Sequence, residues 1–178
     1  MKIKIYAKSH TLNIWVYIIL NKFNDLEFVE RENNLAKILG ITSQSEIKKI
    51  KEASFIAFGR TLGVESFEDG CKKLGISTEL PKIFGLDLVS TNKFLAEYKL
   101  NVIIKALNEG WYPNWEDANE YKYWPYFNMN KNGGFSCWYT LYYLTPSTSV
   151  PSALLLKSSE LAYYCGVKFT PLYKDFYQ

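Results

Sequence analysis

The chain has 178 residues, of which 21 are basic and 18 acidic, and the net charge of +3 is too small to predict nucleic acid or an anionic membrane as a partner. A single histidine and three cysteines exclude most zinc ligand sets and any disulfide-rich framework. Hydrophobic residues make up 48 % and aromatic residues an unusual 17 %, which indicates a globular chain with one domain or two very small ones.

The amino-terminal region contains one clear strand signal and one ambiguous segment. Residues 2–6 alternate lysine with apolar residues, which predicts a half-buried strand. Leu12–Phe23 fits two interpretations, because its β-branched residues favour a strand whereas its apolar spacing, with Ser9 or Thr11 as N-cap, favours a helix. We favour the helix. The apolar run from Leu12 to Leu20 is about half as long as a membrane-spanning helix, and no small-residue cleavage site follows it. We therefore expect a core element rather than a signal peptide or a membrane span.

Three further segments share one ending, in which a basic residue in the last turn is followed shortly by leucine, glycine and then isoleucine or valine. The basic residue suits the negative end of a helix dipole, and glycine readily adopts the left-handed conformation that ends a helix. Ser66, followed by two acidic residues, is a typical N-cap for the third segment. These features predict helices over residues 33–39, 44–62 and 67–74.

A longer helix is expected over residues 91–108. Its apolar residues, among them Val102, Ile103 and Leu107, recur at helical spacing and predict one buried stripe. Glu109 and Gly110 are expected to end this helix.

The remainder of the chain reads as strands followed by helices. Asn128–Gly134 is typical of a turn, and strands are expected over Phe135–Leu144 and Ala153–Lys157. The segment Ser159–Tyr177 has a helical pattern. Pro171 is expected to divide it, because proline is tolerated best in the first turn of a helix.

A composition shift near residue 65 is the one plausible domain boundary. It separates a mostly helical region, residues 1–64, from a second region, residues 65–178, that contains an aromatic-rich hairpin. The expected fold class is α+β, with a helical amino-terminal half and a small antiparallel sheet packed against the helices at 91–108 and 159–177.

Catalytic chemistry has little support in the sequence. His10 is the sole histidine, and no nucleophile, phosphate-binding or metal motif is present. The clusters of acidic residues near Asp69 and Glu116 occur where helix starts or polar loops need them. We therefore expect a protein that is not an enzyme, without a catalytic residue, metal or cofactor. The three cysteines, Cys71, Cys137 and Cys165, lie among apolar neighbours and are expected to be buried thiols in a cytoplasmic setting.

Residues 35–51 are similar to the helix-turn-helix of phage-type repressors, with Gly40 at the turn. In that case Ser43, Gln44, Lys48 and Lys51 would face the bases or phosphates of DNA. One extra residue before Ile47 rotates the second helix by about 100° relative to the usual spacing, which weighs against the motif. A DNA-binding regulator remains an alternative function.

Thirteen aromatic residues fall within residues 111–143. A strand pair buries only one face on its own core, and tyrosine and tryptophan are favoured in binding surfaces, so this block predicts a recognition surface. An aromatic core packed on both sides is the alternative. Period-two alternation places residues 138 and 142 on one face and 139 and 143 on the other. The expected binding residues are Trp111, Trp115, Trp124, Trp138, Tyr139, Tyr142 and Tyr143.

From Ser66 to the end, the sequence resembles an uncharacterised protein family of Bacteroidota phages and prophages, the crAss-like phages among them. The residues that carry the resemblance include Ser66–Ile76, Ile103–Trp111, Tyr121–Phe127, Lys157–Ala162 and Leu172–Phe176. The family brings no established activity. The resemblance implies a phage-encoded binding or structural accessory protein, in the virion or in the host cytoplasm. Its partners would be other virion proteins, host proteins or a second copy of itself, and a host-takeover factor that binds a bacterial protein is a further alternative.

Overall fold

The computed structural model describes residues 3–8, 15–20, 45, 55, 58–129, 134–143 and 150–178. The chain divides into two compact units, Met1–Leu62 and Gly63–Gln178, beside the boundary expected near residue 65. Helices and antiparallel strands occupy separate segments of the chain, so the fold class is α+β, as predicted.

In the first unit, strands β1 (Ile3–Lys8) and β2 (Trp15–Leu20) pair in antiparallel register from Ile3 opposite Leu20 to Lys8 opposite Trp15. The strand prediction for residues 2–6 is confirmed, and the helix favoured over Leu12–Phe23 is wrong. Three β-branched residues within Trp15–Leu20 suit an extended backbone, and β1 supplies the partner that satisfies it. The described part of this unit is therefore not all helical.

The helices expected at 33–39 and at most of 44–62 lie outside the described residues. Those of the second segment that are described, residues 45, 55 and 58–62, are helical. Gly63, which follows, has a φ of +63°, as the glycine ending predicts.

The second unit begins with α3 (Phe67–Leu74), which has the predicted bounds. Its N-cap is Ser66, whose hydroxyl accepts a hydrogen bond from the backbone N–H of Asp69 at 3.1 Å. Gly75 ends the helix with a φ of +66°, and the next residue, Ile76, donates its N–H back to the carbonyl of Cys71. These local caps confirm the sequence reading of this segment.

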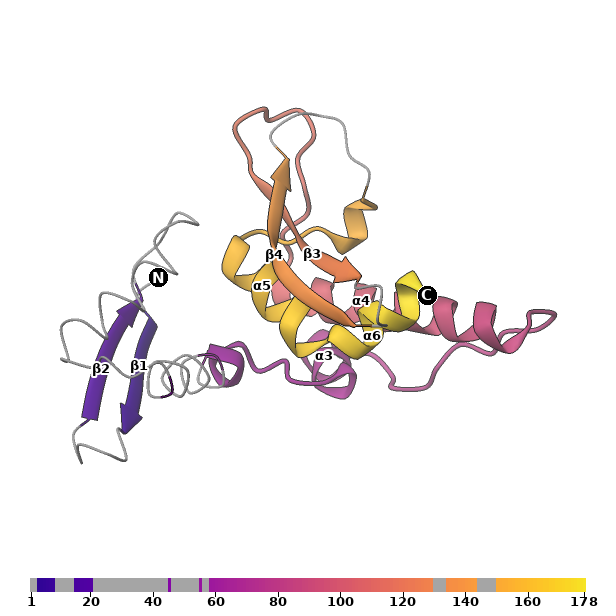
Figure 1. Cartoon of the computed structure of the whole chain (residues 1–178), viewed down its shortest axis with the longest axis horizontal. Helices are drawn as coiled ribbons and strands as arrows, with labels where there is room; N and C mark the ends of the chain where they lie inside the picture. The colour runs from indigo at the N-terminus through magenta and orange to yellow at the C-terminus, as the bar shows by residue number, and fades with distance from the viewer. Residues whose placement is uncertain are drawn as a thin grey trace. The chain divides into compact units, whose positions relative to one another are not determined.

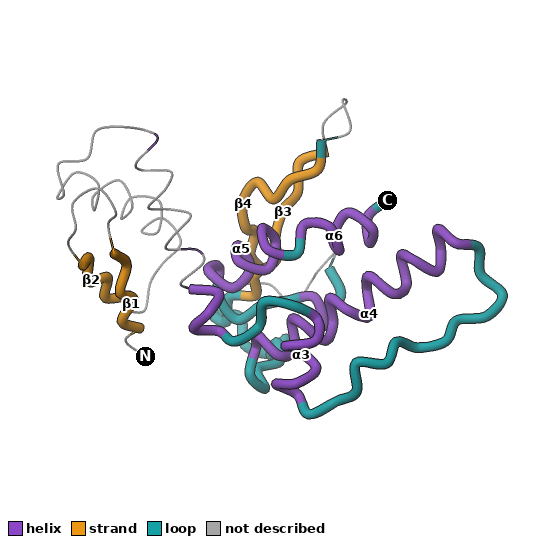
Figure 2. Tube along the Cα trace, turned by 90° about the horizontal axis from the view of Figure 1, so that it is seen from below, coloured by secondary structure: helices purple, strands orange, loops and turns teal. Residues whose placement is uncertain are grey.

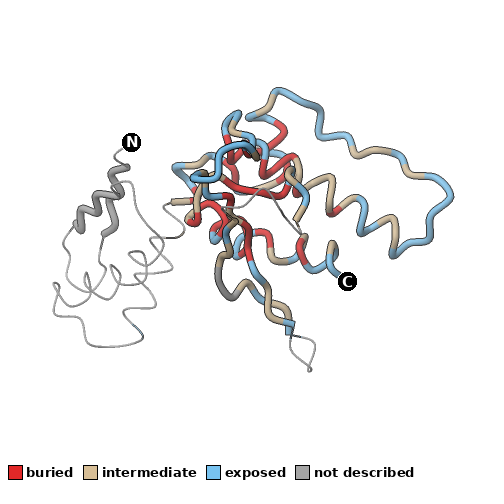
Figure 3. Tube along the Cα trace, turned by 90° about the horizontal axis from the view of Figure 1, so that it is seen from above, coloured by how far each residue is buried: buried red, intermediate tan, exposed pale blue. Residues whose placement is uncertain are grey.

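Helix α4 (Leu88–Asn108) starts three residues before its predicted start, because Asp87 caps it by accepting the N–H of Ser90. The predicted stripe is buried at Val102, Ile103 and Leu107. The loop before α4 and the first turns of the helix extend away from the rest of this unit (Figure 2) and are largely exposed (Figure 3).

Strands β3 (Lys122–Met129) and β4 (Phe135–Tyr143) form an antiparallel hairpin, with β4 at the position expected from the sequence. Helices α5 (Ser159–Lys168) and α6 (Thr170–Tyr177) follow, with Pro171 in the first turn of α6, as predicted. Helix α5 packs against both strands of the hairpin (Figure 1). The main partners of α4 are instead α6 and α3, so the expectation that α4 backs the sheet is wrong.

The strand expected at Ala153–Lys157 is also wrong for most of its length. Residues Ser152–Leu154 form a 3-10 turn, in which Leu154 donates its N–H to the carbonyl of Pro151 at 2.9 Å. Only Leu156 pairs as a strand residue, with Tyr123 of β3. The backbone groups consumed by the turn are not free to form a strand ladder.

Gly166 sets the distance between α5 and the hairpin. A Cβ atom at this position would lie 2.6 Å from Pro125 Cβ and 2.6 Å from Cys137 Sγ. Both strands therefore pack directly against the helix backbone, an approach that any larger residue would prevent.

Replacement of Gly166 by alanine should destabilise the protein by about 1–3 kcal/mol, because the overpacking outweighs the gain in helix propensity of about 1 kcal/mol. Gly70 in α3 is a matched control. A Cβ there meets its nearest neighbour at 3.5 Å, so Gly70→Ala should be neutral or stabilising. Urea unfolding of both variants is the measurement. Equal stability of the two variants would contradict the close approach at Gly166.

Candidate functional site

Three tyrosine rings gather at the end of the hairpin where β3 begins and β4 ends. Tyr121 and Tyr123 stack with 6.0 Å between ring centroids, and Tyr142 meets Tyr121 edge-on at 5.1 Å. The third pair, Tyr123 and Tyr142, is 6.2 Å apart. Tyr121 and Tyr142 remain 45 % and 52 % exposed. We call these three residues the tyrosine cluster.

The other face of the hairpin also carries rings. Trp124 and Tyr143 stack at 4.1 Å, and Trp124 is only 8 % exposed, whereas Tyr126 is largely accessible. A surface hollow of about 650 Å³ lies along β3, lined by residues from both faces of the strand, and we call it the aromatic hollow. Its walls include Trp124, Tyr126, Leu141, Tyr143, Val150 and Tyr177.

The predicted binding residues do not form one surface. Tyr142 is exposed and belongs to the tyrosine cluster, and Trp124 and Tyr143 line the aromatic hollow. Trp111 and Trp115 are half-buried in the loop before β3. The side chains of Trp138 and Tyr139 lie outside the described residues.

A β-bulge interrupts the period-two alternation of β4 at Trp138. Tyr126 lies opposite Tyr139 and Phe127 lies opposite Cys137, which leaves Trp138 without a partner in the register. One extra residue shifts the alternation of the strand. The predicted pairing of 138 with 142 therefore does not extend across this point, whereas 139 and 143 both lie on the regular side of the bulge.

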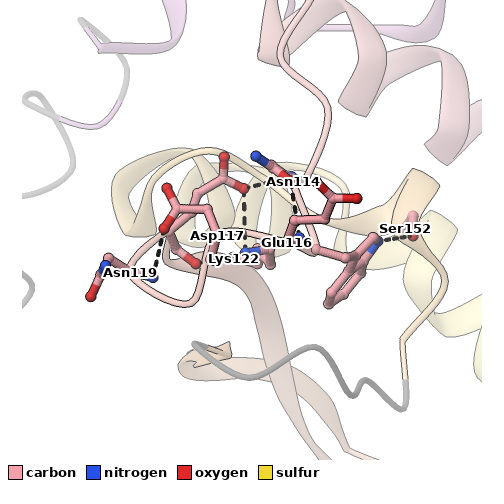
Figure 4. A network of polar contacts seen from close by, with 8 residues as sticks. Asn114, Glu116, Asp117, Asn119, Lys122 and Ser152 are labelled. Carbon is pink, nitrogen blue, oxygen red and sulfur yellow. Dashed lines mark hydrogen bonds and ion pairs between the residues drawn. The ribbon is translucent and has the colours of Figure 1, made fainter.

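The loop before β3 folds around the ammonium group of Lys122, which is 1 % exposed (Figure 4). Lys122 Nζ donates to the carbonyl oxygens of Glu120 at 2.8 Å and Asp117 at 3.3 Å, and it lies 5.4 Å from the centre of the Trp115 ring. Trp115 Nε1 in turn donates to the Ser152 hydroxyl at 3.2 Å. Trp115 thus fixes the loop to the 3-10 turn.

The end of α4 fixes the other side of β3. Asn108, which is buried, donates from Nδ2 to the carbonyl of Leu155 at 2.8 Å and accepts the N–H of Lys157 at 3.1 Å. These two bonds hold the residues on either side of Leu156. Leu156 then exchanges both backbone hydrogen bonds with Tyr123, at 2.8 and 3.0 Å. A side-chain amide on a helix therefore positions the start of β3, and with it the tyrosine cluster.

Glu109, the next residue, adds an ionic contact to this junction. Its carboxylate accepts hydrogen bonds from Lys73 at 2.9 Å and from Lys157 at 3.1 Å. The bond from Lys73, followed by that from Lys157, holds the pKa of Glu109 below its usual range. The residue ends α4 in the left-handed conformation, with a φ of +51°.

The sequence analysis missed a second exposed apolar surface, on the loop before α4 and its first turns (Figure 3). Phe84 is 85 % exposed. The other large apolar residues here are Leu86, Leu88, Val89 and Phe94, all exposed. The signal was present in the sequence, because five large apolar residues surround the N-cap Asp87 without a helical stripe.

The cysteines are unsuited to nucleophilic chemistry at neutral pH. Burial raises the pKa of the Cys137 thiol to about 11 and that of the fully buried Cys165 thiol to about 12, so both stay protonated. Cys71 and Cys165 are buried, as predicted, and Cys137 is half-buried. In the part of the chain that the structure describes, no three His, Cys, Asp or Glu side chains gather as metal ligands would.

The alternative DNA-binding residues, Ser43, Gln44, Lys48 and Lys51, lie outside the described residues. That function therefore stays a prediction. No helix among the described residues is long and apolar enough to cross a membrane.

Asn108→Ala should destabilise the protein by about 2–3 kcal/mol, because the buried carbonyl of Leu155 and the N–H of Lys157 both lose their partner. Asn101 on the same helix is a matched control, since its buried Oδ1 has no hydrogen-bond partner. Asn101→Ala should change the stability by less than about 0.7 kcal/mol or increase it. Chemical denaturation distinguishes the two, and an equal loss in both would show that the amide bonds of Asn108 contribute nothing specific.

The pKa of Glu109 also predicts a pH dependence. A carboxyl group whose pKa is lowered by folding stabilises the fold above its unfolded pKa of about 4.3, and this contribution disappears as the pH falls through the folded value. The side chain is 55 % exposed, so the contribution is below about 1 kcal/mol. Glu109→Gln should lose it at about pH 6 and differ less from the parent chain at about pH 3 in urea unfolding. A difference that is the same at both pH values would contradict the ionic contact.

Comparison with known proteins gives no relative of this chain: no protein-family model, no curated protein and no solved structure matches it.

Proposed function

We propose that the chain is a non-enzymatic, phage-encoded accessory protein that binds a protein partner through the aromatic side chains of the β3–β4 hairpin. The observation that carries this proposal is the tyrosine cluster, in which Tyr121 and Tyr142 are about half exposed although each contacts two other rings. Rings that hold one another in place lose little conformational entropy on binding. They supply large contact areas and hydroxyl groups for hydrogen bonds with a partner.

The aromatic hollow along β3 supports the same function. Its volume of about 650 Å³ suits a few side chains of a partner, and its walls are mostly apolar or aromatic. Interface residues that dominate binding energy are typically tyrosine, tryptophan and arginine set in such pockets. The tyrosine cluster and the aromatic hollow would contact different parts of one partner or two different proteins.

The packing of the hairpin also supports binding over catalysis. The strands are fixed by Gly166, by Leu156 and by the ring of Phe127, which lies 4.6 Å from that of Tyr173 in α6. The scaffold is therefore rigid next to the exposed rings, while the nearest thiol, Cys137, stays protonated. Binding surfaces, like catalytic sites, need such rigid support, and here the groups presented are aromatic rings.

The phage setting rests on the resemblance of residues 66–178 to a family found in Bacteroidota phages. Within that setting we propose a component of the virion, and a binding protein of the host cytoplasm is the alternative. Mass spectrometry of purified particles of the encoding phage tests this directly. Abundant peptides of the chain are expected in washed particles, and their absence would overturn the virion assignment.

Substitution of both Tyr121 and Tyr142 by serine should remove the chain from particles, or lower its copy number at least tenfold, because both accessible rings of the cluster are lost. The melting temperature should stay within a few degrees, since both side chains are about half exposed. Tyr112→Ser is the control, because Tyr112 is 68 % exposed and lies outside the cluster. Quantitative mass spectrometry of particles grown with each variant is the measurement. Normal incorporation of the double variant would contradict the role of the tyrosine cluster.

A further inference from the structure

The two outer edges of the β3–β4 hairpin differ. The edge of β3 is closed at Tyr123, whose N–H and C=O both bond to Leu156. Two residues further on, Pro125 points its backbone nitrogen to the same side as Tyr123 and has no N–H to offer. A partner strand therefore has no continuous row of donors and acceptors along β3.

The edge of β4 is open. Because Tyr123 turns its backbone groups toward Leu156, its register partner Tyr142 must turn its own N–H and C=O away from β3. The same holds for Thr140, which lies opposite Pro125. Within the described residues, β4 pairs with no strand except β3, and the backbone groups of Thr140 and Tyr142 have no hydrogen-bond partner.

The sequence of β4 contains none of the residues that usually prevent an edge strand from pairing with another strand. Its nine residues, FSCWYTLYY, include no charged residue, no proline and no glycine. Soluble proteins usually protect an exposed edge with lysine, proline or a covering element, as β3 is protected here. An uncharged strand with five aromatic residues among nine has a high tendency to pair and no charge repulsion between two copies.

We infer that β4 pairs with β4 of a second copy of this chain, in antiparallel orientation about a two-fold axis at Leu141. In this register Thr140 lies opposite Tyr142 of the other copy, and each of these residues uses the backbone groups that it turns outward. The bulge at Trp138 limits the regular part of the strand to Tyr139–Tyr143, and Leu141 is its midpoint. The result is a continuous four-stranded sheet in the order β3, β4, β4, β3.

A second copy is the occupant because β4 can pair with itself. A two-fold contact uses the same strand from both copies, and that strand must therefore complement itself. The outward backbone N–H and C=O groups of β4 are placed symmetrically, because Thr140 lies on one side of Leu141 and Tyr142 on the other. The segment has no charged side chain that would repel the same segment of a second copy. This inference is independent of the proposed function, because it depends on backbone groups and not on the ring faces of the tyrosine cluster.

Sedimentation velocity over a range of protein concentrations measures the association. The parent chain should form a dimer, and Thr140→Pro should weaken it at least tenfold. The substitution removes an outward N–H without breaking a bond between β3 and β4. Thr140→Ala keeps the N–H and should still dimerise. A parent chain that stays monomeric at about 1 mM would overturn the inference, as would equal association of the two variants.

Cross-linking tests the register even if the proline variant fails to fold. Residues opposite each other at a non-hydrogen-bonded position have Cα atoms about 4.5 Å apart, which a disulfide can span. Leu141→Cys should therefore give a covalent dimer on mild oxidation. Ser136→Cys, on the exposed part of the same strand, should not, and the parent chain controls for the three native thiols.

The outcomes of the two proposals can be separated. Covalent dimers from Ser136→Cys and Leu141→Cys in equal yield, or pairing of β4 only with a strand of another protein, would overturn the inference. Neither result bears on incorporation of the Tyr121 and Tyr142 variant into particles. Failure of that variant to lose incorporation would overturn the proposed function and leave the dimer untouched.

Discussion

The side chain of Asn108 makes the contact on which the arrangement of the carboxy-terminal unit depends. It bonds to the backbone on both sides of Leu156, and Leu156 bonds to β3 at Tyr123. A single amide thus connects the end of α4 to the sheet through a short segment that forms no strand of its own. Because these groups are buried, each bond that is lost leaves an unpaired polar group, and the junction forms as a whole or not at all.

The two faces of the hairpin that this junction holds are covered differently. Gly166 brings the backbone of α5 against Pro125 and Cys137, so the middle of one face is filled. Beyond the reach of α5, the same face carries the tyrosine cluster, and the aromatic hollow lies along β3. The high aromatic content of the sequence therefore serves both purposes: rings such as Phe127 and Tyr173 build the core, and others such as Tyr121 and Tyr142 remain accessible. Because the edge of β3 is closed and the edge of β4 is open, a further strand can add to the hairpin at β4.

Signals carried by neighbouring residues predicted the structure well. Ser66 and Gly75 bound α3 at the expected residues, and Pro171 begins α6, because caps and proline act within one turn of the chain. Segments whose conformation depends on a distant partner were predicted poorly. Leu12–Phe23 had the apolar spacing of a helix, but Trp15–Leu20 is a strand, since β1 offers the hydrogen bonds of a ladder. Only Leu156 of the expected strand at Ala153–Lys157 pairs, because the turn after Pro151 and the bonds to Asn108 use the neighbouring groups.

The candidate binding surface was likewise predicted only in part from the sequence. The sequence by itself determined the α+β class, the caps, the buried stripe of α4 and the concentration of rings in residues 111–143, all of which follow from composition and short-range periodicity. Only the tertiary structure decided which rings are accessible. Trp124 is covered and Trp115 is bound to Ser152, whereas Tyr121, not among the expected binding residues, is exposed. The contacts of each ring decide this, such as the stacking of Trp124 on Tyr143, and they form between residues that are distant in the chain. Burial of a ring is a property of its neighbours in space, and the order of residues along the chain does not specify those neighbours.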